Sequence, residues 1–481
     1  MSFELALGDI LPAESILTSD EAKRPFECDA LSAYRQVPRV VVLPATVEQV
    51  EAIVRLCKEH QVPIVSRGAG TSLSGGALPL KNGCVLSLAK FNKIKKIDPD
   101  KQIAILEPGV RNIAISEAAK PYGLYYAPDP SSQLACSIGG NVAENAGGVH
   151  CLKYGLTVHN LLELKILTSD GQWLVVGNQS LDCPNQDLLT LFTGSEGLLG
   201  IVMEITVKLL VEPLGARVLL AAFHEVEQAG KAVAGLIATG VIPAALEMMD
   251  SLIINAAEDF CHAGYPRDAA AILLCEIDGG EQELDAQAEL ITALFKTHGS
   301  YRVEVSKTDA ERQRFWQGRK LAFPAIGRIA PDYFCMDGTI PRHQLGHVLG
   351  EISRLSAQYD LPVANVFHAG DGNLHPLIAF DANRAGELEK AEEVGGKILE
   401  LCVAVGGTIT GEHGVGVEKL DQMCVQFSPT ELEIFHAIKN VFDPAQLLNP
   451  GKAVPTLHRC AELGGMHVHN GQLPHPELER F

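Results

Sequence analysis

Hydrophobic and polar residues follow two different rhythms over residues 39–90. RVVVLPAT (39–46) and VPIVS (62–66) are short β-branched or apolar runs typical of strands, and Pro44 closes the first. VEQVEAIVRLCKEH (47–60) repeats apolar residues at helical spacing, with Thr46 as a good N-cap. The pattern therefore predicts strand, helix and strand, leading directly into a glycine-rich loop.

Strand-like runs recur further along the chain. IAILEPG, LKILTSD, WLVVG and GIVMEITVKLL lie between residues 100 and 213, around a long glycine-rich connection at 127–155. From about residue 217, RVLLAAF, AAILLCEID and YRVEVS read as strands, whereas AGKAVAGLIATG and QELDAQAELITALFKTHG read as helices. We expect an α+β fold with three segments: 1–213, 214–440, and 441–481 as a return of the chain to the first domain.

Composition narrows the class of protein. The chain has 481 residues, 47% hydrophobic and 20% charged, with a net charge of −20. This balance argues against a nucleic-acid surface and against a polybasic membrane patch. An acidic protein can still bind a small anion where it supplies a local cation.

Cysteines and apolar runs narrow it further. None of the twelve cysteines stands in a Cys-x-x-Cys pair, so no iron–sulfur or zinc-finger spacing is present. The N-terminal residues lack a signal-peptide pattern, and no run of eighteen apolar residues occurs. We expect a cytoplasmic protein with reduced thiols and no direct membrane insertion, any membrane contact being made through a partner.

Two glycine-rich loops suggest a long phosphate-bearing ligand. RGAGTSLSGG (67–76) combines four glycines with three hydroxyl side chains, and PDPSSQLACSIGGNVAENAGG (128–148) contains two Gly-Gly pairs. Glycine lets backbone N–H groups approach a pyrophosphate, but neither loop has the dinucleotide-binding or Walker A spacing. The alternative for each is an ordinary surface loop. Two such loops together favour a cofactor clasped on both sides.

The segment NVFHAGDGNLHPLIAFD (365–381) places two histidines symmetrically about Asp371-Gly372. A two-residue Asp-Gly turn would set His368 directly opposite His375, about 5 Å apart at Cβ, close enough to share a divalent ion. Glu412, in GEHGVG (411–416) after the strand-like run GGTIT, could be a third ligand, with His413 nearby. The alternative is a polar cross-strand pair, which Glu412-His413 between two glycines makes the weaker reading.

These motifs together resemble a known family. RGAGTSLSGG, SIGGNVAENAGG, HAGDGNLHP, GEHGVG and LLNPGK occur in the order found in FAD-linked oxidases of the vanillyl-alcohol oxidase/p-cresol methylhydroxylase (PCMH) superfamily. The C-terminal motifs resemble its 2-hydroxy-acid dehydrogenase branch, that of the bacterial glycolate dehydrogenases. The resemblance covers essentially the whole chain. It implies a PCMH-type FAD-binding domain of two α/β subdomains and an antiparallel-sheet α/β cap domain.

The resemblance also implies roles for individual residues. His368, His375 and Glu412 would hold a divalent metal, Zn or Mn, while His413 would be the proton acceptor and Arg319 the partner of the substrate carboxylate. Arg314 and Lys320 read as surface charges. The residues expected to bind FAD are Arg67, Gly68, Ala69, Gly70, Thr71, Ser72, Pro128, Asp129, Ser131, Ser132, Gly139, Gly140, Asn141, Asn145, Gly147, Gly148, Tyr154, Gly200, Ile201 and Asn449.

The expected reaction is the oxidation of a small 2-hydroxy acid, glycolate to glyoxylate. It moves a hydride to flavin N5 and the hydroxyl proton to His413, and a metal makes that hydroxyl a stronger acid. DYFCMDGTIP (332–341) has no cation for a second carboxylate, which favours a monoacid. The alternatives are a D-lactate dehydrogenase using the same residues and, from another class, a non-catalytic flavoprotein scaffold.

Partners follow from the resemblance as well. It implies a multi-subunit complex, with a second flavin-type subunit and an iron–sulfur subunit, peripheral at the inner membrane. Those subunits, rather than O₂, would then take the electrons. His467, His469 and His475 lie in a polar tail, for which an exposed tail or a partner contact is a better reading than a second metal site.

Overall fold

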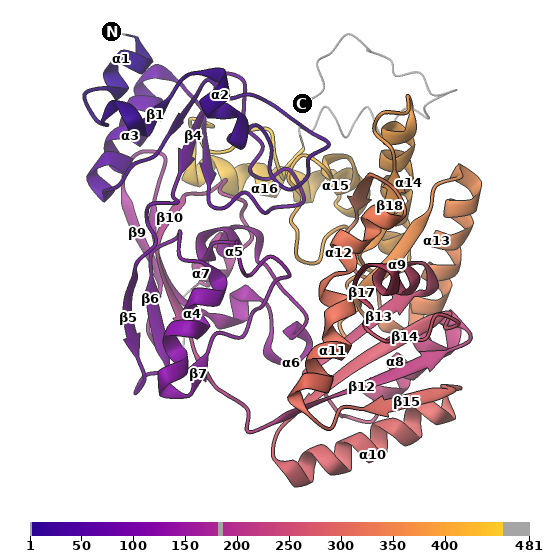
Figure 1. The fold of residues 1–481 in the computed structure, drawn as a ribbon. Helices are drawn as coiled ribbons and strands as arrows, with labels where there is room; N and C mark the ends of the chain where they lie inside the picture. Colours follow the sequence, from indigo (N-terminus) through magenta and orange to yellow (C-terminus); the bar gives the residue numbers. More distant parts are fainter. Residues whose placement is uncertain (1, 181–185, 456–481) are drawn as a thin grey trace.

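The computed structural model describes residues 2–180 and 186–455, in which helices pack against three main β-sheets (Figure 1). The tail histidines at 467–475 lie outside the described residues. In Figure 1 the N-terminal half of the chain occupies one side of the molecule, and residues 216–404 form the other. The candidate site lies where these two halves meet.

The first sheet has the strand order β1-β2-β4-β3, and β2, β4 and β3 run parallel. Thr46 caps helix α3 through a capping box with Gln49, as its spacing predicts. The buried face of α3 packs on β2–β4 through Val50, Ile53, Val54 and Cys57. The elements are α1 (Phe3–Leu7), β1 (Ile16–Leu17), α2 (Asp20–Lys23), β2 (Val40–Val42), α3 (Val47–His60), β3 (Ile64–Arg67) and β4 (Cys84–Ser87).

The second sheet is antiparallel, with the order β5-β6-β10-β8-β9. The sequence suggested an irregular connection at 127–155. In the structure two short helices, α5 and α6, form inside it. The elements are β5 (Ile94–Asp98), β6 (Ile103–Leu106), α4 (Asn112–Ala119), β7 (Leu124–Tyr125), α5 (Ile138–Glu144), α6 (Cys151–Tyr154), β8 (Leu161–Leu167), β9 (Trp173–Gly177), α7 (Leu188–Phe192), β10 (Ile201–Lys208) and β11 (Leu210–Val211).

The third sheet is antiparallel throughout, with the order β15-β12-β14-β13-β17-β18-β16. Its strands are β12 (Ala216–Phe223), β13 (Ala245–Asp250), β14 (Ala271–Asp278), β15 (Arg302–Val305), β16 (Asp332–Cys335), β17 (Val363–His368) and β18 (Pro376–Phe380). The helices of this half are α8 (Val226–Ala238), α9 (Ser251–Cys261), α10 (Glu281–Thr297), α11 (Asp309–Lys320), α12 (Ala322–Ala325), α13 (Leu345–Tyr359) and α14 (Glu387–Ala404).

Both faces of the third sheet are covered by helices, because alternate residues of each strand enter different apolar clusters. In β12, Leu219, Ala221 and Phe223 join the cluster that contains α8, α10, α13 and α14. Val218, Leu220 and Ala222 join the cluster that contains α9, α11 and α12. The second of these faces carries the polar residues of the candidate site.

After α14, the chain returns to the first sheet. Helices α15 (Leu420–Gln426) and α16 (Pro429–Phe442) lead to a parallel bridge between Leu448 and Ile64 of β3. Buried Lys439 donates to the carbonyl oxygens of Leu198 and Leu448, both at 2.7 Å. In Figure 1, α16 accordingly lies near the N-terminal half rather than beside the third sheet.

Two local expectations need correction. GGTIT (406–410) does not form a strand, because only Thr408 makes an isolated bridge, to Thr339. The long connection already noted contains helices. Within the described residues, no helix is long and apolar enough to span a bilayer.

Candidate active site

A cavity of about 410 Å³ lies between the two glycine loops and one face of the third sheet. Sixteen of the residues expected to bind a cofactor, a metal or a proton line it: Arg67, Gly68, Ala69, Gly70, Thr71, Ser72, Ser131, Ser132, Gly139, Gly140, Asn141, Gly200, Ile201, His375, Glu412 and His413. The two glycine motifs and the histidine motifs therefore border one cavity.

Two glycines allow neighbouring segments of the cavity wall to pack closely, because neither has a side chain. A Cβ at Gly68 would collide with Ser137 Oγ, which caps α5. A Cβ at Gly139 would lie 2.7 Å from Pro108 Cβ and 2.9 Å from its carbonyl oxygen. Only glycine permits such close contacts, so the backbone of both loops can lie directly against a ligand, which suits a dinucleotide cofactor.

Seven of the expected cofactor residues do not line the cavity. Several brace its walls instead: Asn449 donates to the carbonyl oxygens of Gly76 (3.0 Å) and Glu196 (2.7 Å), and Asn145 adopts a left-handed conformation (φ 54°) as the C-cap of α5. The full set is Pro128, Asp129, Asn145, Gly147, Gly148, Tyr154 and Asn449.

Asp129 and Tyr154 contact the other half of the molecule. Asp129 Oδ2 lies 2.7 Å from His150 Nδ1, and the second nitrogen of His150 lies 3.4 Å from Glu276 of β14. The hydroxyl of Tyr154 donates to Asp278 at the end of the same strand. These two residues therefore connect the glycine-loop half to the third sheet.

The two histidines of 365–381 are neighbours, but the expected register is wrong. His368 faces Asn373, and Asn365 faces Pro376, so the pairing is displaced by two residues. The turn is a longer loop in which Gly372 (φ 83°) donates its N–H to the carbonyl of His368 at 3.1 Å. A shift of two residues keeps every side chain on its face. The imidazole centroids consequently still lie 5.1 Å apart.

Glu247 of β13 orients the first of these imidazoles. Glu247 and His368 are directly opposed across β13 and β17, and Glu247 Oε1 lies 2.8 Å from His368 Nδ1. Burial opposes ionisation of Glu247, but His368 and Arg319 hold the pKa of this carboxyl below its usual value. The contact fixes the ring and leaves Nε2 directed away from β13. A carboxylate behind a histidine in this way is typical of metal-ligating imidazoles.

Glu412 meets both imidazoles at one of its oxygens. Glu412 Oε1 lies 3.2 Å from His368 Nε2 and 3.0 Å from His375 Nε2, and the potential ligand atoms of the three residues lie within 4.8 Å of one another. His375 Nε2 is buried and makes no hydrogen bond of acceptable geometry within the described residues, despite this distance. Two imidazole nitrogens and a carboxylate oxygen fit a divalent ion such as Zn²⁺.

A second set of possible ligands fits a metal less well. Cys335, His375 and His413 also lie within 4.8 Å of one another. Burial raises the pKa of the Cys335 thiol well above its usual value. Because a thiol must lose its proton to bind a metal, the carboxylate-containing set is the better site.

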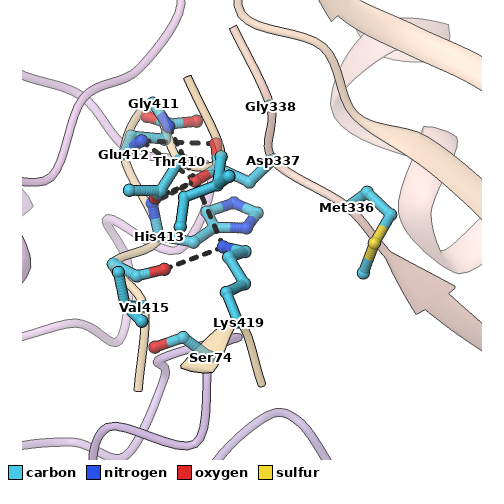
Figure 2. A network of polar contacts seen from close by, with 12 residues as sticks. Ser74, Met336, Asp337, Gly338, Thr410, Gly411, Glu412, His413, Val415 and Lys419 are labelled. Carbon is cyan, nitrogen blue, oxygen red and sulfur yellow. Dashed lines mark hydrogen bonds and ion pairs between the residues drawn. The ribbon is translucent and has the colours of Figure 1, made fainter. Parts of the chain in front are cut away.

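Asp337 holds the loop that carries Glu412 and His413. This buried carboxylate accepts the backbone N–H groups of Gly411 (3.0 Å) and His413 (2.8 Å) and the hydroxyl of Thr410 (2.6 Å), as Figure 2 shows. Lys419 Nζ lies 3.5 Å from the same carboxylate. Burial opposes ionisation, but His413 and Lys419 keep the pKa of Asp337 low. The loop is therefore anchored at its backbone, which leaves its side chains free to face the cavity.

His413 is placed to accept a proton. Its ring stacks on that of His375 at 4.9 Å, with 13° between the planes, and it lines the cavity. Burial lowers the pKa of His413 to about 4, so the imidazole is uncharged at neutral pH. An uncharged imidazole beside a ligand cavity can act as a general base.

A buried carboxylate and a backbone carbonyl also tie this loop to the glycine-loop half. Glu196 accepts the backbone N–H groups of Val415 and Gly416, both at 2.7 Å. The carbonyl of Ser74, in the first glycine loop, accepts the N–H groups of Val417 (3.0 Å) and Glu418 (3.2 Å). The loop that carries His413 and the first glycine loop therefore form one hydrogen-bonded unit.

Arg319 and Lys320, the last two residues of α11, lie in different environments. Arg319 is 2% exposed and its Nε donates to Glu247 Oε2 at 2.7 Å, while its NH2 nitrogen is buried with no hydrogen-bond partner among the described residues. Lys320 and Arg314 are both exposed, as expected of surface charges, and of the two only Lys320 also lines the cavity.

Sequence reasoning did not identify Glu247 or Asp337. A usable signal existed for Glu247: it is the single acidic residue inside the apolar run AALEMM (244–249), where an unpaired charge would be costly. Asp337 follows β16 in CMDGT and gave no comparable signal, because its partners lie 36 to 82 residues away.

Comparisons with known proteins agree with this geometry. A family described as "FAD linked oxidases, C-terminal domain" matches residues 213–453, and one described as "FAD binding domain" matches residues 38–177. The chain is 62% identical to "Glycolate oxidase subunit GlcD" of Escherichia coli (strain K12), over 99% of this chain and 96% of that protein. It is 32% identical to a "D-lactate dehydrogenase" of Anaerostipes hadrus, over 91% of this chain and 94% of that one.

A solved structure shares the fold. The structure of p-cresol methylhydroxylase with substrate bound has a TM-score of 0.79 at 18% identity, over 95% of this chain and 97% of that one. The PCMH-type fold expected from the sequence is thereby confirmed, and so is its FAD-binding domain.

Proposed function

The chain belongs to the family of FAD-linked oxidases, and on that premise we propose that it is the glycolate-oxidising flavoprotein subunit of a glycolate oxidase. The observation that carries the proposal is the single cavity that runs from both glycine loops to His375, Glu412 and His413. An enzyme that oxidises an alcohol needs a redox cofactor, a polarised hydroxyl and a base in one space, and this cavity can hold all three.

The residues divide the task among them. FAD bound along the glycine loops would supply the two-electron acceptor, and a divalent metal held by His368, His375 and Glu412 would make the substrate hydroxyl more acidic. His413 accepts the hydroxyl proton, because its imidazole is uncharged and faces the cavity. Glu247 and Asp337 keep the imidazoles and the loop in place before substrate arrives.

The substrate carboxylate needs a cation near the proposed metal ligands and His413. The buried, unpartnered NH2 nitrogen of Arg319 is a suitable donor, since an unsatisfied guanidinium nitrogen gains a partner when a carboxylate binds. Glu247 fixes the guanidinium through Nε, so Arg319 is oriented in advance. We propose that Arg319 binds this carboxylate.

A second candidate substrate is D-lactate, since relatives named D-lactate dehydrogenase match most of the chain. Glycolate is preferred because those relatives share about half the identity of the glycolate oxidase subunit. The two substrates differ by one methyl group, so the discrimination expected from an apolar contact is about 1–3 kcal/mol.

We propose a division into a FAD-binding domain at 1–213, a cap domain at 214–440 and a C-terminal return at 441–481. The bridge between Leu448 and Ile64 supports that return. We also propose that a second flavin-type subunit and an iron–sulfur subunit take the electrons, at the periphery of the inner membrane. The chain has no Cys-x-x-Cys pair of the kind that holds an iron–sulfur cluster, so a partner is proposed to supply one.

An anaerobic absorbance titration of the FAD-loaded chain tests the function. Glycolate is expected to bleach the flavin absorbance at lower concentration than D-lactate, and L-lactate least. The reduced chain should then pass electrons to an artificial dye faster than to O₂. Lack of bleaching by all three acids would refute the proposal, and stronger bleaching by D-lactate would favour the second candidate.

A further inference from the structure

Lys320 is a cation on the cavity wall that has no ion pair or hydrogen bond with any described residue. It is the last residue of α11, and the wall continues through Phe323 and Pro324 of α12 and Tyr333 of β16. These neighbours offer mainly apolar surface. An unpaired ammonium group beside such a wall is available to an anionic ligand.

Its neighbour Arg319 has a different role. Consecutive residues on a helix point about 100° apart, so Arg319 turns into the sheet, while Lys320 is exposed at the wall of the cavity. Arg319 has already neutralised Glu247 through Nε, which leaves one guanidinium nitrogen for a ligand. The positive charge of Arg319 is therefore largely compensated before a substrate arrives.

The cavity wall offers an anion few other cations. Carboxylates of Glu144, Glu196 and Glu412 line it. The one other Lys or Arg in the described lining is Arg67, which belongs to the first glycine loop, donates to Ala77 and stacks over Phe26. A 2-hydroxy acid enters as a carboxylate, so it needs a cation, and among the described lining residues Lys320 is the Lys or Arg that has no partner yet.

We propose that Lys320 captures the carboxylate of the incoming 2-hydroxy acid, and that Arg319 then orients it. The proposal rests on the proposed function and adds a second cation to it. Lysine suits capture because it is a flexible, hydrated point charge, whereas the planar guanidinium of Arg319 suits orientation. Loss of Lys320 should then weaken substrate binding while leaving the step that follows binding nearly unchanged.

The test uses the FAD-loaded full chain and two variants of one helix. Lys320→Met removes the charge, and Arg314→Met removes an exposed cation of α11 that does not line the cavity. Binding of oxalate, an unreactive carboxylate analogue of glycolate, is followed by its perturbation of the flavin spectrum. Lys320→Met should raise the oxalate Kd and the glycolate KM about tenfold, or ~1.4 kcal/mol, with kcat within about twofold.

Three further observations sharpen the test. Lys320→Arg keeps the cation and should stay within about threefold of the wild-type Kd. Added salt should weaken oxalate binding to the wild type more than to Lys320→Met, because screening acts on the charge that the variant lacks. Glycolamide, which is uncharged, should bind both proteins alike.

The outcomes separate this proposal from the function. An unchanged oxalate Kd in Lys320→Met, an equal loss in Arg314→Met, or a loss confined to kcat would overturn the capture role even where glycolate still bleaches the wild-type flavin. If glycolate and the lactates leave the wild-type flavin oxidised, the function itself fails, whatever the oxalate Kd of the variants.

Discussion

The cavity has two ends that are built in different ways. The glycine-loop end is made of backbone: close contacts such as that of Gly139 with Pro108 require the absence of a side chain. The histidine end is made of buried ionisable side chains, including His368, Glu412 and Glu247, which pair with one another. One end recognises its ligand by shape and backbone polarity, the other by charge and ligand geometry.

This difference shows where each end is vulnerable. A backbone cradle tolerates no added atom but contains few charges whose loss would matter. A network of buried charges tolerates small changes in shape, but removal of one partner leaves another charge unpaired in a poorly polarisable surrounding. The two ends should therefore lose their ligands independently when each is disturbed in its own way.

The largest effect is expected at the point where the two ends meet. His413→Ala removes the proposed base, and flavin reduction by glycolate should slow about 10²–10⁴-fold, while FAD and metal contents stay at wild-type levels. Stopped-flow absorbance gives the rate, and metal analysis gives the occupancy. His347→Ala, an exposed imidazole on α13, is the matched control. Reduction at the wild-type rate in His413→Ala would remove this residue from the mechanism.

The second-largest effect is expected from a substitution that disturbs only the glycine-loop end of the cavity. Gly139→Ala places a Cβ against Pro108, and over-packing of this kind costs about 1–3 kcal/mol, so FAD affinity should fall about 5- to 150-fold. Metal content should remain unchanged. Flavin fluorescence of the released cofactor measures the affinity. Gly350→Ala, where nothing lies within 4 Å of the new Cβ, should retain FAD. If metal is lost together with FAD, the two ends are not independent.

The smallest effect is expected from a substitution that disturbs only the histidine end of the cavity. Glu247→Gln removes the carboxylate behind His368, and loss of such a partner typically lowers metal affinity 10- to 100-fold. FAD should stay bound. Glu276→Gln is the control, because it changes a buried glutamate on the neighbouring strand that contacts Trp316 and Arg312 instead of a proposed metal ligand. Wild-type metal affinity in Glu247→Gln would show that His368 needs no orienting partner.

Much of the fold and part of the site could be predicted from the sequence. The capping box of α3, the strands and the glycine motifs are local, because each depends on residues within a few positions of one another. Short motifs also identified sixteen residues that line the cavity, although the meeting of those motifs in one cavity is a property of the tertiary structure. The histidine pair was found although its register was wrong, because a shift of two residues keeps side chains on the same face.

By itself, the sequence determined which segments could be cradles, strands and ligands, because backbone conformation and side-chain chemistry are local properties. Only the tertiary structure decided that Glu247 stands behind His368, that Asp337 anchors the loop of His413, and that Lys320 rather than Arg314 reaches the cavity. Those contacts join residues far apart in the chain. They depend on strand register and on the direction in which a helix end points, which no short stretch of sequence specifies.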